Sequence, residues 1–265
     1  VAKPYPKSWA SLVTGARLAK QRFGFDAQHS IVATVPSQHM YGLETTVMVP
    51  LMVGSHLYAD KPFFPEDIRI ALNTCKEKRV LITTPIHLRA CVAAGLQWPT
   101  LDFIISATAP LDQDLLHAAS DTFNTRILEI YGCTEAGSLA SREPSKELAW
   151  TLYDDFMLSN NEVNSIVSAP HLSEDVVLSD VVKTVEHNRF HLLGRHADMV
   201  NIAGKRASLS DLNIKLIAVD GVQDGVFFMP DKNGKMSSRL TALVVAPEID
   251  TNSILSALST QIDNV

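Results

Sequence analysis

The order of apolar and helix-like segments constrains the fold of this chain more than any other feature. Short apolar segments typical of buried strands occur at residues 31–36, 54–58, 80–85, 103–106 and 127–130. Helical patterns occupy residues 8–22, 65–78, 87–94 and 112–123. Strands that alternate with helices in this way form a parallel, twisted sheet. The pattern therefore predicts an α/β fold built on a parallel βαβ sheet.

The pattern changes after Arg142. Short apolar runs broken by Asp, Asn and Ser over residues 150–170 predict antiparallel strands of a smaller sheet. A strand over residues 176–180 and a hairpin turn at Asn188–Arg189 follow. Beyond Asp198, strands at 199–203, 206–209, 222–229 and 240–246, a helix capped by Ser210 and a helix from Thr251 predict a compact α+β unit.

Composition excludes several classes of function. The 265 residues are 46% hydrophobic and carry a net charge of −6 with a pI near 5.8. The negative net charge and the lack of a basic stripe argue against a surface that binds nucleic acid or an anionic membrane. Apolar runs are shorter than the roughly 18 residues of a membrane-spanning helix. Cys75, Cys91 and Cys133 show neither metal-ligand spacing nor an even count, which predicts a reducing compartment such as the cytoplasm.

Residues 127–137 hold the most informative group of polar side chains. A strand over 127–130 leads to Gly132, which we expect to turn the chain sharply before Thr134 and Glu135. Ligands bind open α/β sheets at the carboxyl ends of their strands. There a carboxylate can hold Mg²⁺, a hydroxyl can donate to a phosphate oxygen, and the ring of Tyr131 can cover a flat base. A strand end with a solvated Thr–Glu pair is the alternative.

Further polar or small residues stand where strands end or helices begin. His39 follows the strand over 31–36 and could line a substrate pocket, although a single histidine is more often structural. Small residues at 106–111 allow a flat ligand close to the backbone. Asp180 could accept two sugar hydroxyls, or be an ordinary turn aspartate. Lysines near residue 8 could hold phosphate, or be simply solvated.

Taken together and in this order, these segments resemble the motifs of the adenylate-forming superfamily of acyl-CoA synthetases, acyl-AMP ligases and nonribosomal adenylation domains. The resemblance covers nearly the whole chain. It implies that residues 1–195 are the C-terminal part of a large AMP-binding domain, with a parallel sheet and a smaller antiparallel one. Residues 196–198 would form a hinge, and residues 199–265 a small α+β domain.

The resemblance also implies a role for each motif. Tyr131–Glu135 is similar to the family's Tyr-Gly-x-Thr-Glu, in which the tyrosine packs on adenine, the threonine meets the phosphate and the glutamate binds Mg²⁺. Lys7 best matches the lysine of the phosphate-loop motif, so the expected catalytic residues are Thr134, Glu135 and Lys7. The expected nucleotide-binding residues are Ser106, Ala107, Thr108, Ala109, Pro110, Tyr131, Gly132, Asp180 and Arg195. The expected acyl pocket consists of His39, Met40, Tyr41, Gly42 and Cys133. The expected hinge and thiol-step loop consist of Ala197, Asp198, Gly204, Lys205 and Arg206.

The sequence departs from the family pattern in places. Ala107 stands where glycine is more usual, and Ala197 stands where the hinge commonly has Asp or Lys. The family's catalytic lysine lies beyond the last helix, after the point where this chain stops, and Gly234–Lys235 is expected in a turn between two strands. We therefore expect the 265 residues to be part of a longer protein.

The reaction implied by the resemblance is ATP-dependent activation of a carboxylic acid to acyl-AMP, followed by transfer to a thiol. Its cofactors would be ATP or AMP, Mg²⁺, and CoA or the phosphopantetheine of an acyl carrier protein. Residues 130–142 and 204–209 most resemble the ligases of aryl-polyene pigment clusters, which load an aromatic acid onto a carrier protein. The alternatives are an inactive nucleotide-binding relative, an interaction module, and a nonribosomal amino-acid adenylation domain. A homodimer is compatible with each.

Overall fold

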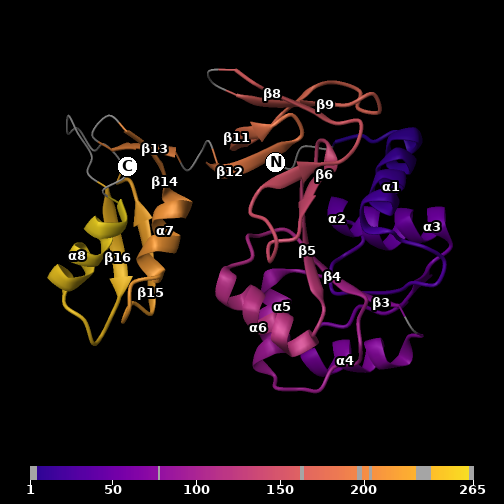
Figure 1. Cartoon of the computed structure of the whole chain (residues 1–265), viewed down its shortest axis with the longest axis horizontal. Helices are drawn as coiled ribbons and strands as arrows, with labels where there is room; N and C mark the ends of the chain where they lie inside the picture. The colour runs from indigo at the N-terminus through magenta and orange to yellow at the C-terminus, as the bar shows by residue number, and fades with distance from the viewer. Residues whose placement is uncertain are drawn as a thin grey trace. The chain divides into compact units, whose positions relative to one another are not determined.

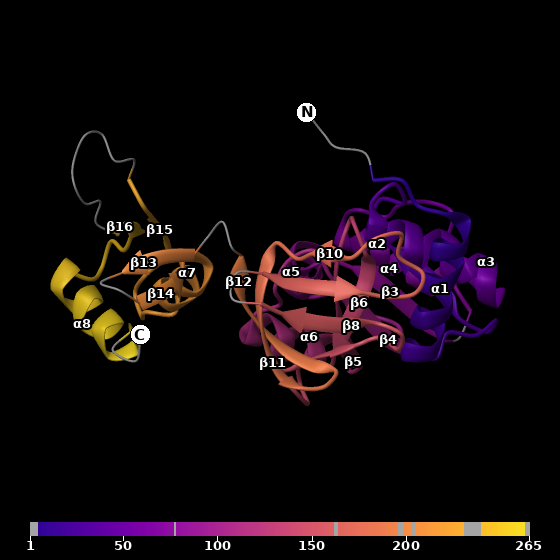
Figure 2. The same cartoon turned by 90° about the horizontal axis from the view of Figure 1, so that it is seen from above.

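The computed structural model describes residues 5–76, 78–161, 164–195, 199–202, 205–230 and 240–262. The chain divides into two compact units. The first contains residues 1–160, 166–177 and 184–191, and the second contains residues 161–165, 178–183 and 192–265. Figures 1 and 2 show the elements of both units in two views.

A nine-stranded mixed sheet forms the centre of the fold, in the order β11-β12-β7-β6-β5-β4-β3-β1-β2. Its parallel part consists of β2 (His56–Leu57), β1 (Ser30–Ala33), β3 (Arg79–Thr83), β4 (Phe103–Ser106) and β5 (Arg126–Cys133). Antiparallel pairing begins at β6 (Gly137–Arg142) and continues through β7 (Trp150–Leu152) and β12 (Arg189–Arg195). At the far edge lies β11 (Asp180–Glu186). A separate antiparallel sheet consists of β8 (Met157–Asn160), β9 (Ser165–Ser168) and β10 (Val176–Val177).

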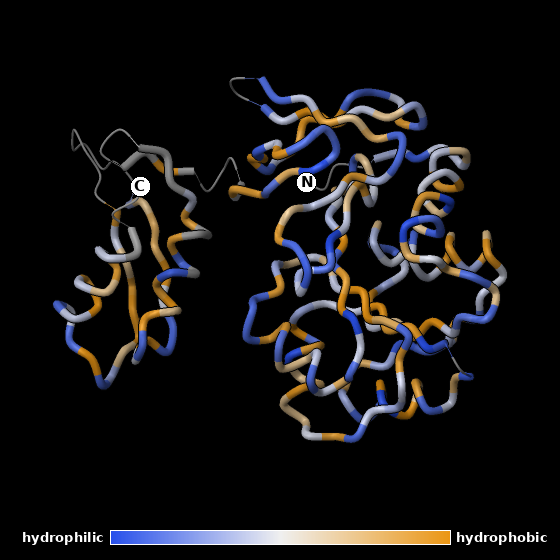
Figure 3. Tube along the Cα trace, in the orientation of Figure 1, coloured by the Kyte–Doolittle hydropathy of each residue, from blue (hydrophilic) through white to orange (hydrophobic). Residues whose placement is uncertain are grey.

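Strands β1, β3 and β4 are buried on both faces, which explains why they read as continuous apolar runs rather than alternating ones. Figure 3 shows the hydropathy along the chain. On one face, helices α4 (Pro65–Thr74), α5 (Pro85–Ala93) and α6 (Gln113–Phe123) pack in one core cluster. Val32, Leu81, Ile104 and Ile127 supply the strand side of that cluster. The intervening Ile31, Ile82 and Ile105 point to the other face and are also buried.

A second group of helices precedes and follows β1. Helix α1 (Trp9–Phe23) begins at Ser8, whose hydroxyl accepts from the backbone N–H of Ser11, and it ends at Gly24 with a φ of 74°. Residues 40–53 form one continuous helical segment made of α2 (Met40–Gly42), a π-helical stretch η1 (Leu43–Met48) and α3 (Val49–Val53). Helix α1 packs on η1 and α3.

The second unit contains two antiparallel pairs and two helices. The pairs are β13 (Met199–Ile202) with β14 (Lys205–Ser208), and β15 (Asp224–Phe228) with β16 (Thr241–Val245). Helix α7 (Leu209–Ile217) follows β14, and α8 (Thr251–Ile262) follows β16. Leu216, Val219, Ile254 and Leu258 form the core of this unit.

The predicted fold class is confirmed, and most strands and helices lie within a few residues of their predicted positions. Four predictions are wrong in detail. Strand β5 continues through Gly132 to Cys133, so the chain does not turn at Gly132. β7 joins the large sheet rather than the small one. Asp180 begins β11 instead of ending a strand, and Ser210 lies inside α7 instead of capping it. The predicted turn around Gly234–Lys235 lies outside the described residues.

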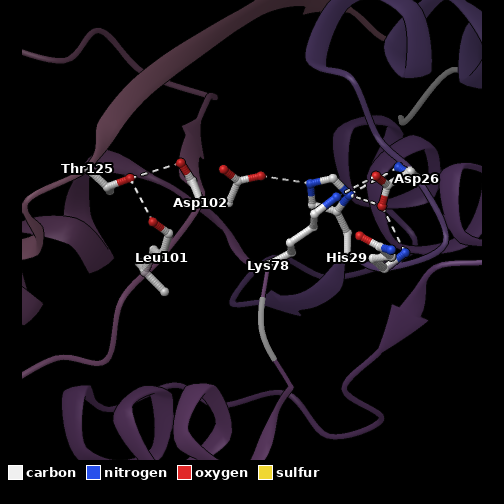
Figure 4. Close-up of polar contacts among 7 residues, drawn as sticks. Asp26, His29, Lys78, Leu101, Asp102 and Thr125 are labelled. Carbon is white, nitrogen blue, oxygen red and sulfur yellow. Dashed lines mark hydrogen bonds and ion pairs between the residues drawn. The ribbon is translucent and has the colours of Figure 1, made fainter.

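A charged network closes the amino-terminal edge of the parallel strands (Figure 4). The ring of His29, 3% exposed, joins Asp26 through Nδ1 and Asp102 through Nε2, both at 2.9 Å. Lys78 Nζ donates to Asp26 at 2.8 Å. The hydrogen bonds from Lys78 and from the backbone N–H of Gln28 lower the pKa of Asp26 to about 2 from an ordinary 3.8. Asp26 therefore stabilises the fold in its charged form.

We predict that Asp26→Asn destabilises the first unit near neutral pH and that the difference from the parent narrows as pH falls from about 4 to about 2. The sign follows because a lowered folded pKa gives stability that is present above the unfolded pKa and lost as the carboxylate is protonated. Denaturant midpoints measured by tryptophan fluorescence report this unit, which contains all three tryptophans. Asp60→Asn, at an exposed aspartate, is the control. A gap between Asp26→Asn and the parent that stayed constant with pH would contradict the prediction.

Candidate active site

The predicted site segments of the first unit follow the carboxyl ends of its parallel strands. Residues 34–42 follow β1, residues 84–87 follow β3, residues 107–111 follow β4 and residues 134–136 follow β5. These ends lie at one edge of the sheet because the strands run parallel.

The turn that carries Thr134 and Glu135 links β5 to β6 in a tight antiparallel hairpin. The register shifts between Tyr131 and Gly132, which leaves Leu139 as an extra residue on β6. A Cβ on Gly132 would lie 2.3 Å from the carbonyl oxygen of Gly137, and Gly137 itself has a φ of 85°. Gly132 is thus required by the close approach of two backbones, not by a turn.

The amino-terminal segment reaches this turn. Lys7 Nζ donates to the backbone carbonyl of Glu135, which is 128 positions away in the sequence. The hydroxyl of Tyr5 is hydrogen-bonded to the carboxylate of Glu135. Two segments that were predicted separately, one from the start of the chain and one from the end of β5, therefore meet in the structure.

The ionisation of these groups follows from partial burial and mutual charge. Burial lowers the pKa of Lys7, while Cys133, Glu44 and Glu135 oppose that shift. Burial favours the neutral form of Glu135, but hydrogen bonds from its own backbone N–H, Tyr5 and Cys133, together with the charge of Lys7, hold its pKa below the ordinary value. Burial raises the pKa of Cys133 to about 11, so this thiol is protonated at neutral pH. Thr134 is exposed.

The segment after β4 holds an unsatisfied and a strained residue. Ser106 is fully buried, and its hydroxyl has no hydrogen-bond partner. Ala107 is also buried, whereas Thr108, Ala109 and Pro110 are exposed. Thr108 has a φ of 80°, a conformation that is strained for a β-branched side chain. An orphaned buried hydroxyl and a strained loop residue are typical of a ligand-binding edge.

A buried ion pair that sequence reasoning missed fixes this segment. Glu129, 2% exposed, accepts from the backbone N–H of Leu111 at 3.1 Å and from Arg142 Nε at 2.6 Å. Burial raises the pKa of Glu129, and the charge of Arg142 opposes the shift. The guanidinium of Arg142 also covers the ring of Trp150, 4.5 Å from its centroid. This ion pair could not be predicted from the sequence, because Glu129 and Arg142 become neighbours only through the register in which β5 and β6 pair.

Tyr131 lies in an aromatic group rather than at the surface. Its ring is 9% exposed and packs against Trp150 and Phe190, with ring centroids 5.6 and 5.8 Å away. The predicted packing of Tyr131 on adenine stays a prediction.

The predicted acyl pocket segment contains two anchoring residues. The hydroxyl of Tyr41 donates to the carbonyl of Ile105 at 2.9 Å and to that of Thr83 at 3.3 Å. Burial raises its pKa well above the ordinary value. A Cβ on Gly42 would lie 2.1 Å from the carbonyl oxygen of Pro36. Tyr41 and Gly42 therefore hold the helical segment against the sheet, while His39 is exposed and Met40 half-buried.

A polar cluster at the ends of β1 and β3 was also missed. Thr34 Oγ1 lies 3.0 Å from Thr83 Oγ1 and 3.2 Å from His87 Nδ1, and Thr84 Oγ1 lies 3.0 Å from the same nitrogen. Burial lowers the pKa of His87, so its ring is neutral at neutral pH. The signal that could have revealed this cluster is the threonine at the end of each apolar strand, Thr34 after β1 and Thr83–Thr84 at the end of β3.

The remaining predicted residues belong to the second unit or fall outside the described residues. Asp180 begins β11, Arg195 ends β12, and Lys205 and Arg206 begin β14. A Cβ on Gly194 would lie 2.2 Å from Ser208 Oγ, so β12 and β14 come close within this unit. Ala197, Asp198 and Gly204 lie outside the described residues.

The donor set at the turn suits magnesium with a phosphate better than a site built from protein ligands alone. Within the described residues, no three His, Cys, Asp or Glu side chains gather as a metal site. Mg²⁺ is commonly held by one or two carboxylates together with substrate phosphates and water. The half-buried carboxylate of Glu135 beside the exposed hydroxyl of Thr134 fits that kind of site.

Comparison with known proteins identifies the family. The profile of the AMP-binding enzyme family matches residues 5–164, which include the Lys7 segment and the Thr134–Glu135 turn. The chain belongs to this family. In the part that the structure describes, no helix is long and apolar enough to cross a membrane.

Two curated relatives match most of the chain. It is 21% identical over 233 residues to a 3,4-dihydroxybenzoate–[aryl-carrier protein] ligase of Bacillus anthracis, covering 84% of this chain and 54% of that protein. It is 26% identical over 223 residues to a 4-coumarate–CoA ligase of Rhodobacter capsulatus, covering 83% and 56%. The chain thus spans about half the length of the curated relatives it matches.

Solved structures of AMP-binding enzymes share the fold. ATP-bound MatB from Rhodopseudomonas palustris superimposes with a TM-score of 0.82 at 19% identity, covering 97% of this chain and 58% of that one. O-succinylbenzoate coenzyme A synthetase (MenE) from Bacillus subtilis, in complex with ATP and magnesium, gives 0.80 at 12% identity, covering 96% and 59%. At these identities the likeness establishes the fold alone.

We predict that Thr108→Gly raises the free energy of unfolding by about 1 kcal/mol, because relief of a strained φ outweighs the added freedom of the unfolded chain. Thr108 is exposed, so the change removes no core packing. Thr108→Ala, which keeps a Cβ at the same φ, is the control and should gain less. Urea denaturation followed by tryptophan fluorescence measures both. Equal stability of the glycine variant and the parent would contradict the strain.

Proposed function

We propose that the protein to which this chain belongs activates a carboxylic acid with ATP to form acyl-AMP and then transfers the acyl group to the thiol of CoA or of a carrier protein's phosphopantetheine. Family membership supports the reaction class. The observation that carries the proposal is the contact of Lys7 and Tyr5 with Glu135. This contact brings a cation, a hydroxyl-bearing turn and a metal-competent carboxylate to the carboxyl end of β5.

In the first step, a carboxylate oxygen of the acid attacks the α-phosphorus of ATP and pyrophosphate leaves. Negative charge grows on the phosphate oxygens, and preorganised donors stabilise it. Thr134 is the proposed hydroxyl donor to that phosphate, and Lys7 the nearby positive charge. Glu135 would hold Mg²⁺, which would neutralise part of the negative charge on the phosphate. In the second step the thiol attacks the acyl carbonyl carbon and AMP leaves.

The nucleotide contacts are proposed residue by residue, beginning with the segment after β4. We propose that residues 106–110 bind the adenine and that the hydroxyl of Ser106, which has no partner in the protein, donates a hydrogen bond to it. Asp180 is proposed to accept the ribose hydroxyls, and Arg195 to contact the nucleotide. Residues 1–195 would act as the large domain, and residues 199–265 as a small domain that moves about residues 196–198 between the two steps.

The proposed acid is aromatic. Met40, Tyr41, Ala107, Thr108 and Cys133 give a lining that is more apolar than charged. Both curated relatives described above are named for aromatic acids. The resemblance of residues 130–142 to the aryl-polyene ligases points the same way and favours a carrier protein as acceptor. The buried carboxylate of Glu44 lies beside Met40, but Ser138 already donates to its oxygens.

We predict that Glu135→Ala in the complete enzyme lowers ATP–pyrophosphate exchange by at least about 100-fold, roughly 3 kcal/mol, because one charge-stabilising group is lost at the phosphate. The fold should persist, since Glu135 is half-buried in a turn. Glu66→Ala, at an exposed glutamate of α4 paired with Arg69, is the matched control and should leave exchange unchanged. Exchange near the parent rate in Glu135→Ala would remove the proposed role.

We further predict that a hydroxybenzoate-type acid supports exchange better than any of the twenty amino acids. The reason is that the acyl lining offers apolar contact, while the buried carboxylate of Glu44 already accepts from Ser138. Exchange with a panel of aryl acids, medium-chain acids and amino acids measures the ranking through kcat/KM. An amino acid at the head of the ranking would assign the protein to the nonribosomal branch.

A further inference from the structure

We propose that Glu44 is a positioning residue: its buried carboxylate holds the first residues of β6 and thereby fixes the Thr134–Glu135 turn against the helical segment 40–53. The proposal rests on the proposed function for its kinetic consequence, but its structural consequence can be measured without activity. Glu44 was not singled out by sequence reasoning.

The contact joins two parts of the chain that are 94 positions apart. Glu44 is 4% exposed, and both of its carboxylate oxygens lie 3.1 Å from the backbone nitrogen of Ser138. The hydroxyl of Ser138 donates to Oε2. Ser138 is the second residue of β6, three positions after Glu135. Donation from both the backbone and the side chain of one residue fixes its position more tightly than either bond alone.

The space around the carboxylate is closely fitted. A Cβ on Gly137 would lie 2.5 Å from Glu44 Oε1 and 3.4 Å from Met40 Cε, and one on Gly15 of α1 would lie 3.3 Å from Oε1. Glycines on β6 and α1 therefore leave room for the carboxylate from two sides. The carboxylate also lies next to Met40, a residue of the proposed acyl pocket.

The helical segment that carries Glu44 is itself anchored. Glu44 lies in the π-helical stretch η1, a form that is rare and frequent at functional sites. Thr45 and Thr46 donate to the carbonyls of Tyr41 and Gly42, each at 2.7 Å. Tyr41 in turn donates to the carbonyl of Ile105 on β4. A continuous series of contacts thus runs from β4 through η1 to the start of β6.

Burial disfavours the charged form of Glu44, and its polar neighbours only partly offset that effect. Burial raises its pKa, whereas the two Ser138 donors and the positive charge of Lys7 oppose that shift. Lys7 also donates to the carbonyl of Glu135. Burial and the charge of Glu44 raise the pKa of Tyr153, whose buried hydroxyl has no hydrogen-bond partner. A well-packed apolar side chain could fill such a site at lower cost, so a buried acid here is better explained by the position that it imposes.

The test compares Glu44→Gln, Ser138→Ala and the double variant with Thr46→Val in the complete enzyme. Thr46→Val removes a buried hydroxyl from the same π-helical stretch, one that donates to the carbonyl of Gly42 rather than to Ser138, so it is the matched control. Two readouts are measured: kcat and KM for the acid in ATP–pyrophosphate exchange, and amide hydrogen exchange of peptides covering residues 131–142.

Glu44→Gln should lower kcat by about 10-fold or more with KM for the acid nearly unchanged, because a small displacement of the turn misplaces the groups that meet the phosphate. Ser138→Ala, which keeps the backbone donor, should lose less, and the double variant should be no worse than Glu44→Gln because both changes break the same contact. Residues 134–142 should exchange faster in Glu44→Gln than in the parent or in Thr46→Val.

Unchanged hydrogen exchange and kcat in Glu44→Gln would overturn the proposal, and so would losses equal to those of Thr46→Val, which indicate a purely structural role. A rise in KM for the acid with kcat retained would make Glu44 a substrate-binding group instead. If the parent forms no adenylate with any acid, the proposed function fails, and hydrogen exchange alone still decides the role of Glu44.

Discussion

Strand β5 pairs in parallel with β4 on one side and antiparallel with β6 on the other, and the site depends on that change of direction. A parallel strand must leave its edge through a long crossover, but an antiparallel partner returns at once through a tight turn. The turn of residues 134–136 is therefore held by strands on both sides. Gly132 and Gly137 permit the close backbone approach that makes this return possible. Larger residues would push the turn away from the edge.

Two buried carboxylates join the loops of this edge to the sheet. Glu129 accepts from the backbone of Leu111 and from Arg142, and so fixes the segment after β4. Glu44 accepts from Ser138 and fixes the segment after β5. In each case a carboxylate on a rigid element satisfies a backbone N–H beside a loop, which a hydrophobic side chain cannot do. Rigid support of this kind keeps loop residues in register with a substrate.

Sequence pattern predicted the parallel half of the fold because buried strands and their helices have local signatures, such as the exact strand at 103–106 and the helices expected over 8–22 and 112–123. It also predicted that residues 131–135 form a site, because strand ends in parallel sheets share one edge. It could not predict that Lys7 reaches Glu135 or that Glu44 reaches Ser138, since these contacts join residues 128 and 94 positions apart. The role of Gly132 was wrong for the same reason: a close approach between strands has no local signal.

The two edges of the parallel sheet differ in how their polar groups are satisfied. At the amino-terminal edge, hydrogen bonds join Asp102, His29, Asp26 and Lys78 in one series (Figure 4). At the carboxyl edge, Ser106 has an orphaned buried hydroxyl and Thr108 a strained φ. Natural sequences break local rules mainly at functional sites, where a ligand supplies the missing interactions. The amino-terminal edge has such features too, since Lys78 has a φ of 57° and the buried hydroxyl of Ser55 before β2 has no partner, but Lys78 is paired there with Asp26. At the carboxyl edge the unmet hydrogen bond and the strained φ occur together in one loop, two residues apart, beside the turn of Thr134 and Glu135, and this coincidence supports the carboxyl edge as the ligand-binding edge.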